Sequence, residues 1–161
     1  MSKQIQYQVS IKWTGNKGDG TKDYDAYDRS HEVNIKGKKK LACSSDSPFR
    51  GDAKKHNPED LLLASLSSCH MLWYLRLCAS EGVVVLDYVD DAEGKMIQTS
   101  NGSGYFTEVI LSPKVVVADQ TMVKKELELH KKANAFCFIA NSVKFSIYHK
   151  PEIIVKQLKN Y

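Results

Sequence analysis

Four cysteines, Cys43, Cys69, Cys78 and Cys137, are the residues of this sequence that could carry nucleophilic or redox chemistry. A cysteine thiolate is both a nucleophile and a metal ligand. No two of these residues form a CxxC or CxxH pair, so a structural zinc site has little support. In a reducing compartment the four side chains stay thiols unless they take part in redox chemistry.

One cysteine lies in the middle of a long predicted helix, residues 57–82 (NPEDLLLASLSSCHMLWYLRLCASEG). Asn57 suits the N-cap, and Pro58 suits the first helical position, where its missing N–H costs nothing. Gly82 suits the C-terminal stop. The helix is apolar on nearly all sides, so it must be covered by sheet, by other helices or by a second subunit.

The helix also limits how the cysteines can pair. Cys69 and Cys78 are nine residues apart, a rise of about 13.5 Å, which is too far for a disulfide. A second helical region is expected over residues 119–141, and Cys137 lies near its end. Two central helices in a small protein pack together, so Cys137 is the candidate partner of Cys69. The alternative is that both are ordinary buried cysteines, and Cys78 is expected in the core.

Glu59 raises a geometric problem, because it precedes Cys69 by ten residues, or about 15 Å of helix. The two side chains cannot touch within one chain. If two copies of the helix cross antiparallel near Ala64, Glu59 of one chain lies opposite Cys69 of the other. This reasoning gives a hypothesis of a homodimer with a composite site at its interface.

Composition indicates one globular domain over residues 1–161, with 42% hydrophobic and 26% charged residues. A net charge of +4 spread along the chain gives little reason to expect nucleic-acid binding. No uninterrupted apolar run reaches the roughly 18 residues of a spanning helix, and the N-terminus has no apolar signal core. We therefore expect no membrane association and a cytoplasmic location.

The order of the predicted elements favours an α+β fold with antiparallel sheet. Strands are expected first, then the long helix, then more strands, the second helical region and a final strand. The expected strands are residues 4–13, 24–35 (as one strand or two), 41 onward, 83–92, 96–99, 105–117 and 143–148.

The segment NPEDLLLASLSSC resembles the first motif of the OsmC/Ohr family of thiol-dependent peroxidases. In that motif an Asn-Pro-Glu start leads to a reactive cysteine ten residues after the Glu. A second family motif places another cysteine late in the chain, matched here by Cys137 in ANAFCFIANSVKF. The resemblance extends from Trp13 to about Tyr148. It implies an OsmC-like fold, in which antiparallel sheets wrap around two central helices in an intertwined homodimer.

The resemblance also implies an activity, the reduction of organic hydroperoxides without a metal or flavin cofactor. Carried over by position, Cys69 is the peroxidatic thiolate and Cys137 the resolving thiol, and a dithiol reductant reopens their disulfide. Glu59 orients a catalytic arginine. Arg50 occupies the place of that arginine in the OsmC branch, and Arg29 its place in the Ohr branch.

Two residues depart from the family pattern, namely His70 directly after Cys69 and Phe138 directly after Cys137. Successive helical residues point about 100° apart, so we expect His70 to be structural or to face a partner. His130 is expected on the polar side of the second helix.

Two other functions compete with the peroxidase. One is a non-catalytic dimeric binding or stress-response protein of the same fold, whose thiols are incidental. The other is a metal site built from Cys69, His70 and His130, which is disfavoured because residues 69 and 70 do not share a helix face.

Overall fold

The computed structural model describes residues 3–156, and the chain divides into two compact units, residues 1–61 and 62–161. The α-helices are α1 (Pro58–Ser80) and α2 (Val123–Phe136). The strands are β1 (Ser10–Trp13), β2 (His31–Asn34), β3 (Leu41–Cys43), β4 (Val85–Asp90), β5 (Glu93–Gln98), β6 (Gly104–Leu111), β7 (Pro113–Val117), β8 (Ser146–His149) and β9 (Glu152–Val155). The single domain expected from composition stays a prediction.

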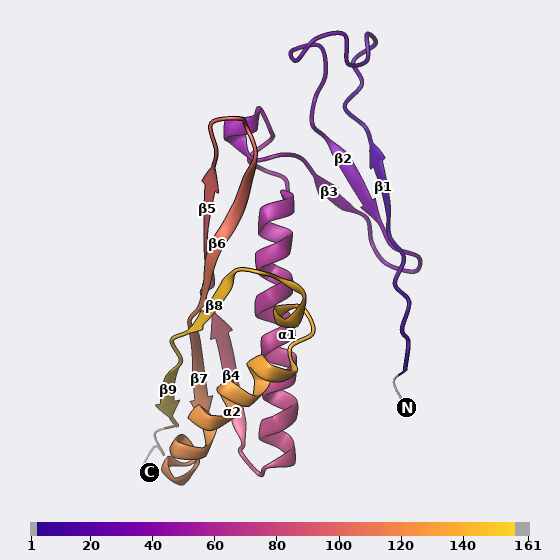
Figure 1. Cartoon of the computed structure of the whole chain (residues 1–161). Helices are drawn as coiled ribbons and strands as arrows, with labels where there is room; N and C mark the ends of the chain where they lie inside the picture. The colour runs from indigo at the N-terminus through magenta and orange to yellow at the C-terminus, as the bar shows by residue number, and fades with distance from the viewer. Residues whose placement is uncertain (1–2, 157–161) are drawn as a thin grey trace. The chain divides into compact units, whose positions relative to one another are not determined.

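The first unit contains a three-stranded antiparallel sheet in the order β1-β2-β3 (Figure 1). Val33 in the central strand lies opposite Ile11 on one side and Leu41 on the other. The turn between β2 and β3 contains Gly37 at a φ of 79°, a left-handed conformation that favours glycine. Strands are confirmed within the predicted ranges 4–13 and 24–35 and from residue 41, but β1 and β2 are each only four residues long.

The second unit contains two three-stranded sheets, β4-β7-β9 and β5-β6-β8. Strands β4 and β7, and strands β5 and β6, pair antiparallel, as expected. The pairs β7–β9 and β6–β8 are parallel, so the prediction of purely antiparallel sheet is wrong. A parallel pair needs a long crossover connection, and the segment that contains α2 supplies it before β8 and β9.

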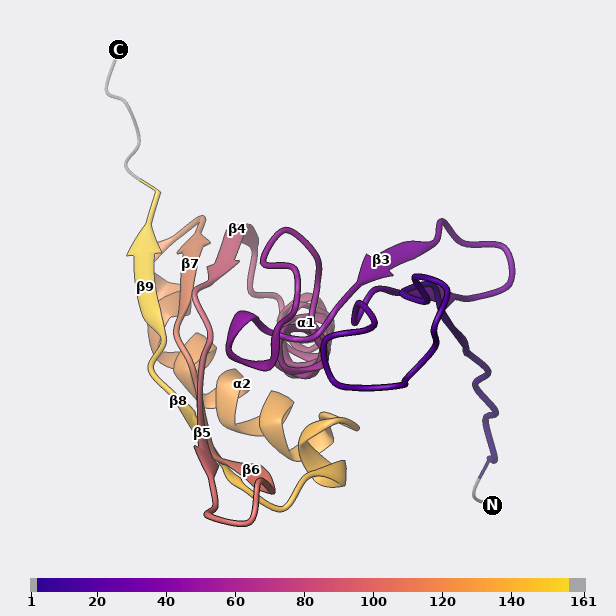
Figure 2. The ribbon, with the colours of Figure 1, turned by 90° about the horizontal axis from the view of Figure 1, so that it is seen from above.

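The predicted strand over residues 105–117 is in fact two strands in different sheets. Strand β6 ends at Leu111 and β7 begins at Pro113, and the residue between them, Ser112, donates its backbone N–H to Asp90 at 2.7 Å. Proline has no N–H for a sheet ladder, which is consistent with a change of sheet at this point. Figure 2 shows the strands of this unit as one layer, with α1 and α2 on the same side of it.

Helix α1 buries a single stripe of residues spaced by four: Leu66, His70, Tyr74 and Cys78. Residues at this spacing lie on one face of a helix, and here that face packs into the second unit. The predicted N-cap is confirmed, because the Asn57 side chain accepts the backbone N–H of Asp60 at 2.7 Å. The stripe mixes apolar and polar side chains, which the apolar sequence of the helix did not suggest.

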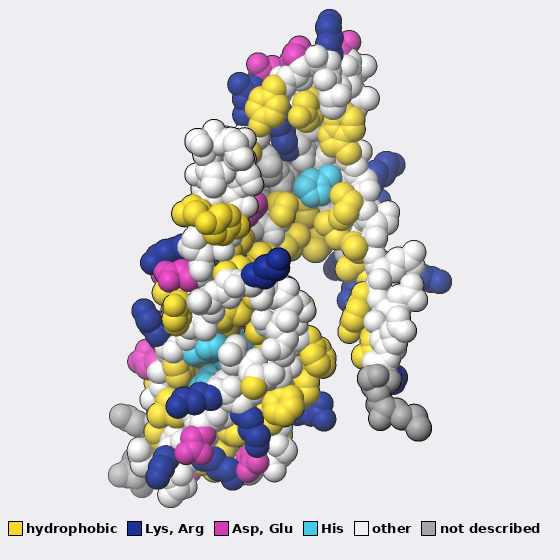
Figure 3. Space-filling view, viewed as in Figure 1, with side chains coloured by type: hydrophobic (Ala, Val, Ile, Leu, Met, Phe, Trp, Pro, Cys, Tyr) yellow, Lys and Arg dark blue, Asp and Glu magenta, His cyan; other side chains and the backbone are white. Residues whose placement is uncertain are grey.

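By length and composition alone α1 is also apolar enough to cross a membrane, a test that the core helix of a soluble protein also passes. The sequence reading counted only uninterrupted apolar runs and so missed this property. Part of the apolar surface of α1 is exposed, including Leu72, which is 63% exposed. Figure 3 shows hydrophobic side chains on the surface of both units.

Leu66 tests how much the buried stripe stabilises the second unit. Its side chain is 1% exposed and packs with Val109 and Leu111. We expect Leu66→Ala to lower the free energy of unfolding in urea by about 2–5 kcal/mol, the usual cost of a cavity in a core. Leu127→Ala, at a position that is 44% exposed on α2, is the matched control and should cost much less. Equal losses would contradict the assignment of Leu66 to the core.

Candidate functional site

The second unit brings Cys69 and Cys137 together. Cys69 is half-buried on α1, and Cys137 is buried at the C-cap of α2. Burial and a side-chain hydrogen bond with Cys69 raise the pKa of the Cys137 thiol to about 11. At neutral pH the Cys137 side chain is therefore a protonated thiol. Both side chains are free thiols.

Aromatic side chains that neighbour the two cysteines along the chain pack on one another. Trp73, one helical turn after Cys69, stacks on Phe136 with ring centroids 5.2 Å apart. It also meets Phe138 edge-on at 5.5 Å. Phe136 and Phe138 flank Cys137 in sequence, so this contact is independent evidence that the two cysteine-bearing segments adjoin. Phe138, the departure from the family pattern, is therefore part of the aromatic contact with α1.

The backbone around Cys137 is fixed as well. The Cys137 N–H donates to Asn134 O at 3.2 Å, and the Cys137 sulfur accepts the backbone N–H of Ala140 at 3.4 Å. These bonds hold the end of α2 against the short 3₁₀ turn Ala140–Ser142. The sulfur of Cys137 is thus held by the backbone N–H of Ala140.

Both candidate arginines belong to the first unit and line one polar pocket of about 230 Å³. Arg50 forms an ion pair with Asp25, and its guanidinium lies 4.9 Å from the ring centroid of Tyr24. Arg29 donates to the carbonyl oxygens of Tyr27 and Tyr24 at 2.6 and 2.7 Å. Because Arg50 and Arg29 line the same pocket, its geometry does not show which of them is the catalytic arginine.

Glu59 lies in the first turn of α1, where its negative charge is stabilised by the positive end of the helix dipole. Among residues 3–156, no hydrogen bond or ion pair joins Glu59 to Arg50 or Arg29. The structure pairs Arg50 with Asp25 instead. The catalytic roles of Glu59 and of the arginine therefore stay predictions.

The sequence reading missed a buried polar cluster between α1 and α2, which we call the histidine network: His70, His130, Glu126 and Tyr74. His70 Nε2 lies 2.9 Å from His130 Nδ1, and His130 Nε2 lies 3.1 Å from Glu126 Oε1. The Tyr74 hydroxyl donates to the same Glu126 oxygen. All four side chains are at most 2% exposed. The expectation that His130 faces solvent is wrong, because α2 turns this position toward α1.

Glu126 Oε1 accepts the Tyr74 O–H, and in the tautomer with a proton on Nε2, His130 donates to the same oxygen. In that tautomer His130 Nδ1 accepts from His70 Nε2. His70 Nδ1 and Glu126 Oε2 are buried without a hydrogen-bond partner in the described part of the chain. The imidazole of His149 packs on His70, with ring centroids 4.5 Å apart.

Burial sets the charge state of this cluster. It lowers the pKa of His70 to about 3, and repulsion from His149 and then His130 acts in the same direction. Burial likewise lowers the pKa of His149, and it raises the pKa of the Tyr74 and Tyr88 hydroxyls above their usual range. At neutral pH, His70 and His149 are therefore uncharged, and both hydroxyls keep their protons.

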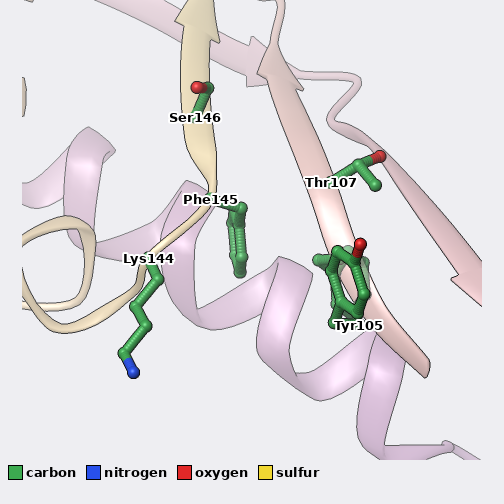
Figure 4. A pocket seen from close by; sticks show the side chains of 6 residues that line it. Tyr105, Thr107, Lys144, Phe145 and Ser146 are labelled. Carbon is green, nitrogen blue, oxygen red and sulfur yellow. The ribbon is translucent and has the colours of Figure 1, made fainter. Parts of the chain in front are cut away.

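A separate pocket of about 570 Å³ lies at the starts of β6 and β8 (Figure 4). It is lined by Tyr105, Phe106, Thr107, Lys144, Phe145 and Ser146. None of these is a candidate catalytic residue. Within residues 3–156, no three His, Cys, Asp or Glu side chains are arranged to hold a metal ion.

Comparison with known proteins identifies the fold. A family model described as OsmC-like protein matches residues 51–152. The chain belongs to the OsmC-like family. A solved OsmC-like protein of unknown function from Vibrio cholerae is 29% identical, has a TM-score of 0.81, and the match covers 94% of this chain and 100% of that one.

Other OsmC relatives are more distant. The uncharacterized protein YmaD of Bacillus subtilis is 23% identical over 154 residues, covering 93% of this chain and 94% of YmaD. A solved organic hydroperoxide resistance protein OsmC from Legionella pneumophila is 18% identical, with a TM-score of 0.65 and coverage of 93% and 98%. At these identities the likeness shows the shared fold.

The pKa of His70 makes the stability of this OsmC-like protein depend on pH. Between pH 6.5 and about 3, His70 binds a proton in the unfolded chain but not in the folded one. Stability is therefore complete above pH 6.5 and falls as the pH is lowered, by about 1.4 kcal/mol per pH unit for each such proton. His149 adds a change of the same sign.

Urea unfolding between pH 7 and pH 4.5 measures this slope in the parent and in His70→Phe. The variant should have the shallower slope, whatever its stability at pH 7, because it lacks the group that titrates. Equal slopes in the two proteins would contradict the burial of a neutral His70.

Proposed function

We propose that this protein is a thiol-dependent peroxidase that reduces organic hydroperoxides through Cys69 and a Cys69–Cys137 disulfide. The observation that carries the proposal is that the segments bearing Cys69 and Cys137 adjoin in an OsmC-like fold, where Trp73 packs on Phe136 and Phe138. Solved structures of the same fold include organic hydroperoxide resistance proteins from Elizabethkingia anophelis and Legionella pneumophila. The family thus supports a role in the peroxide or stress response.

The first step oxidises Cys69. Its thiolate attacks one peroxide oxygen, the O–O bond breaks, and the departing alkoxide takes up a proton to leave as an alcohol. Cys69 becomes a sulfenic acid. The rings of Trp73, Phe136 and Phe138 give the site an apolar side, which favours an organic hydroperoxide over a small polar one.

The second step closes the disulfide. The Cys137 sulfur attacks the sulfenic sulfur of Cys69, and the S–O bond breaks. The departing hydroxide takes the proton of Cys137 and leaves as water. Because its pKa is raised, Cys137 is protonated at neutral pH and loses its proton during this attack. A dithiol reductant then restores both thiols by exchange and is itself oxidised to a disulfide.

The charged part of the proposed site comes from a second copy of the chain. Glu59 and Cys69 are ten residues apart on the continuous helix α1, about 15 Å, so one chain cannot join them. An antiparallel crossing of two α1 helices near Ala64 would place Glu59 of one copy opposite Cys69 of its partner. Ala64 and Ser68 are small and exposed, and Leu72 is exposed, as such a crossing requires. Arg50 or Arg29 would then supply the positive charge.

Thiol mapping tests the peroxidase. After one equivalent of cumene hydroperoxide, the reduced parent should contain a Cys69–Cys137 disulfide, detected by mass spectrometry. Cys137→Ser should stop at a sulfenic acid on Cys69, and Cys69→Ser should keep its remaining thiols. Cys43→Ser, which removes a buried thiol of the first unit, is the matched control and should react like the parent. Four free thiols in the treated parent would instead favour the non-catalytic binding or stress-response protein.

Mixing two inactive variants tests the composite site. Cys69→Ser and Glu59→Ala should each be impaired as homodimers. Unfolded together and refolded, they should form heterodimers in which one site carries both changes and the other carries none, so about a quarter of all sites become intact. No recovery of peroxidase activity in a verified heterodimer would contradict a site shared between two chains.

A further inference from the structure

The histidine network joins the two helices that carry Cys69 and Cys137. His70 follows Cys69 on α1, and it points into the core while Cys69 stays half-buried. His130 precedes Cys137 by seven residues, which is two turns of α2 or about 10 Å along its axis. The 2.9 Å contact between the two imidazoles therefore joins the helix that carries Cys69 to the helix that ends at Cys137.

We propose that the histidine network is a positioning device, which fixes the register of α2 against α1 and so holds Cys137 where it can close a disulfide with Cys69. The network touches neither sulfur in the contacts that the structure describes. It acts through the two helices. Its role in catalysis rests on the proposed peroxidase function, whereas its effect on the relative placement of the two thiols does not.

Directional hydrogen bonds make the network suited to this role. Apolar side chains at a helix contact can slide past one another with little loss, but a donor and an acceptor must stay within about 3 Å of each other. If α2 slipped along α1, His130 would lose His70, and Tyr74 would lose Glu126. Each loss would leave a buried polar group without a partner, at a cost of about 1–3 kcal/mol.

The closure of a disulfide is sensitive to such a slip. Bonded sulfurs lie about 2.05 Å apart with a restricted torsion angle, so the two backbones must be held within a narrow range. A misplacement of about 1 Å can slow a reaction between positioned groups by about 100-fold. The first oxidation step needs only Cys69 and peroxide and does not need the register of α2.

Paired variants separate the network from general packing. His130→Leu removes both of its hydrogen bonds, whereas His130→Asn keeps an acceptor near the position of Nδ1 for His70. Tyr74→Phe removes a hydroxyl that is bonded to Glu126. Tyr88→Phe removes a buried hydroxyl that has no partner among the described residues, so it is the matched control. Leu66→Ala is the control for lost stability outside the network.

The first measurement, made without peroxide, is the equilibrium constant for forming the Cys69–Cys137 disulfide in a glutathione buffer. This constant reports how well the two thiols are placed to bond. We expect His130→Leu and Tyr74→Phe to lower this constant at least tenfold. His130→Asn should recover part of the loss, and Tyr88→Phe and Leu66→Ala should stay within about twofold of the parent. Parent-like values in both His130→Leu and Tyr74→Phe, or a similar loss in Leu66→Ala, would overturn the proposal.

The two peroxide steps are then timed separately by rapid quench with cumene hydroperoxide. Sulfenic acid formation should be unchanged in the network variants, whereas disulfide closure should slow by about 10- to 100-fold. Slower closure should let a second peroxide convert Cys69 to sulfinic acid, which is visible by mass. A parent that does not react with peroxide overturns the proposed function alone, because the glutathione equilibrium still reports on the register. Equal slowing of both steps would overturn the positioning role.

Discussion

The contact between α1 and α2 is the interaction on which the rest of this structure depends. One stripe of α1, repeating every fourth residue, supplies Leu66, His70, Tyr74 and Cys78 to the interior. The buried residues of helix α2 are Glu126, Leu129, His130 and Ala133. The same contact decides whether Cys137 lies near Cys69, because each sulfur is carried by one of the two helices. A change in the packing of α1 on α2 would therefore also change the placement of Cys137 relative to Cys69.

The contact is unusual because it is polar at its centre. A buried carboxylate and two buried imidazoles are costly unless their hydrogen bonds are made. An apolar contact of the same size would be at least as stabilising, as replacements of buried ion pairs show in other proteins. In the proposed positioning role, the polar groups add a preferred register, because a slip of one helix along the other would break their hydrogen bonds. For the proposed Cys69–Cys137 disulfide, a defined register matters in a way that stability alone does not measure.

Sequence reasoning succeeded where a single local pattern decides the outcome. Asn57 and Pro58 marked the start of α1, and the Asn-Pro-Glu spacing led to Cys69 and to the family. It failed where the outcome depends on a distant segment. Nothing in the local sequence shows that β8 and β9 pair in parallel, because that follows from the crossover through α2. His130 was misplaced for the same reason: the polar residues around it suggested a solvent face.

A usable signal for the network did exist in the sequence. His70, Tyr74 and Cys78 share one helix face at a spacing of four with Leu66, and a polar residue within a buried stripe needs a partner from another element. In α2, Glu126 and His130 have the same spacing of four, which places them on one face as well. Two helices that each present two polar groups on one face are candidates for pairing through those faces. The pattern becomes informative only when both helices are considered together. Cys69 precedes the polar pair of α1 and Cys137 follows the polar pair of α2, so pairing of these faces would align the two cysteines.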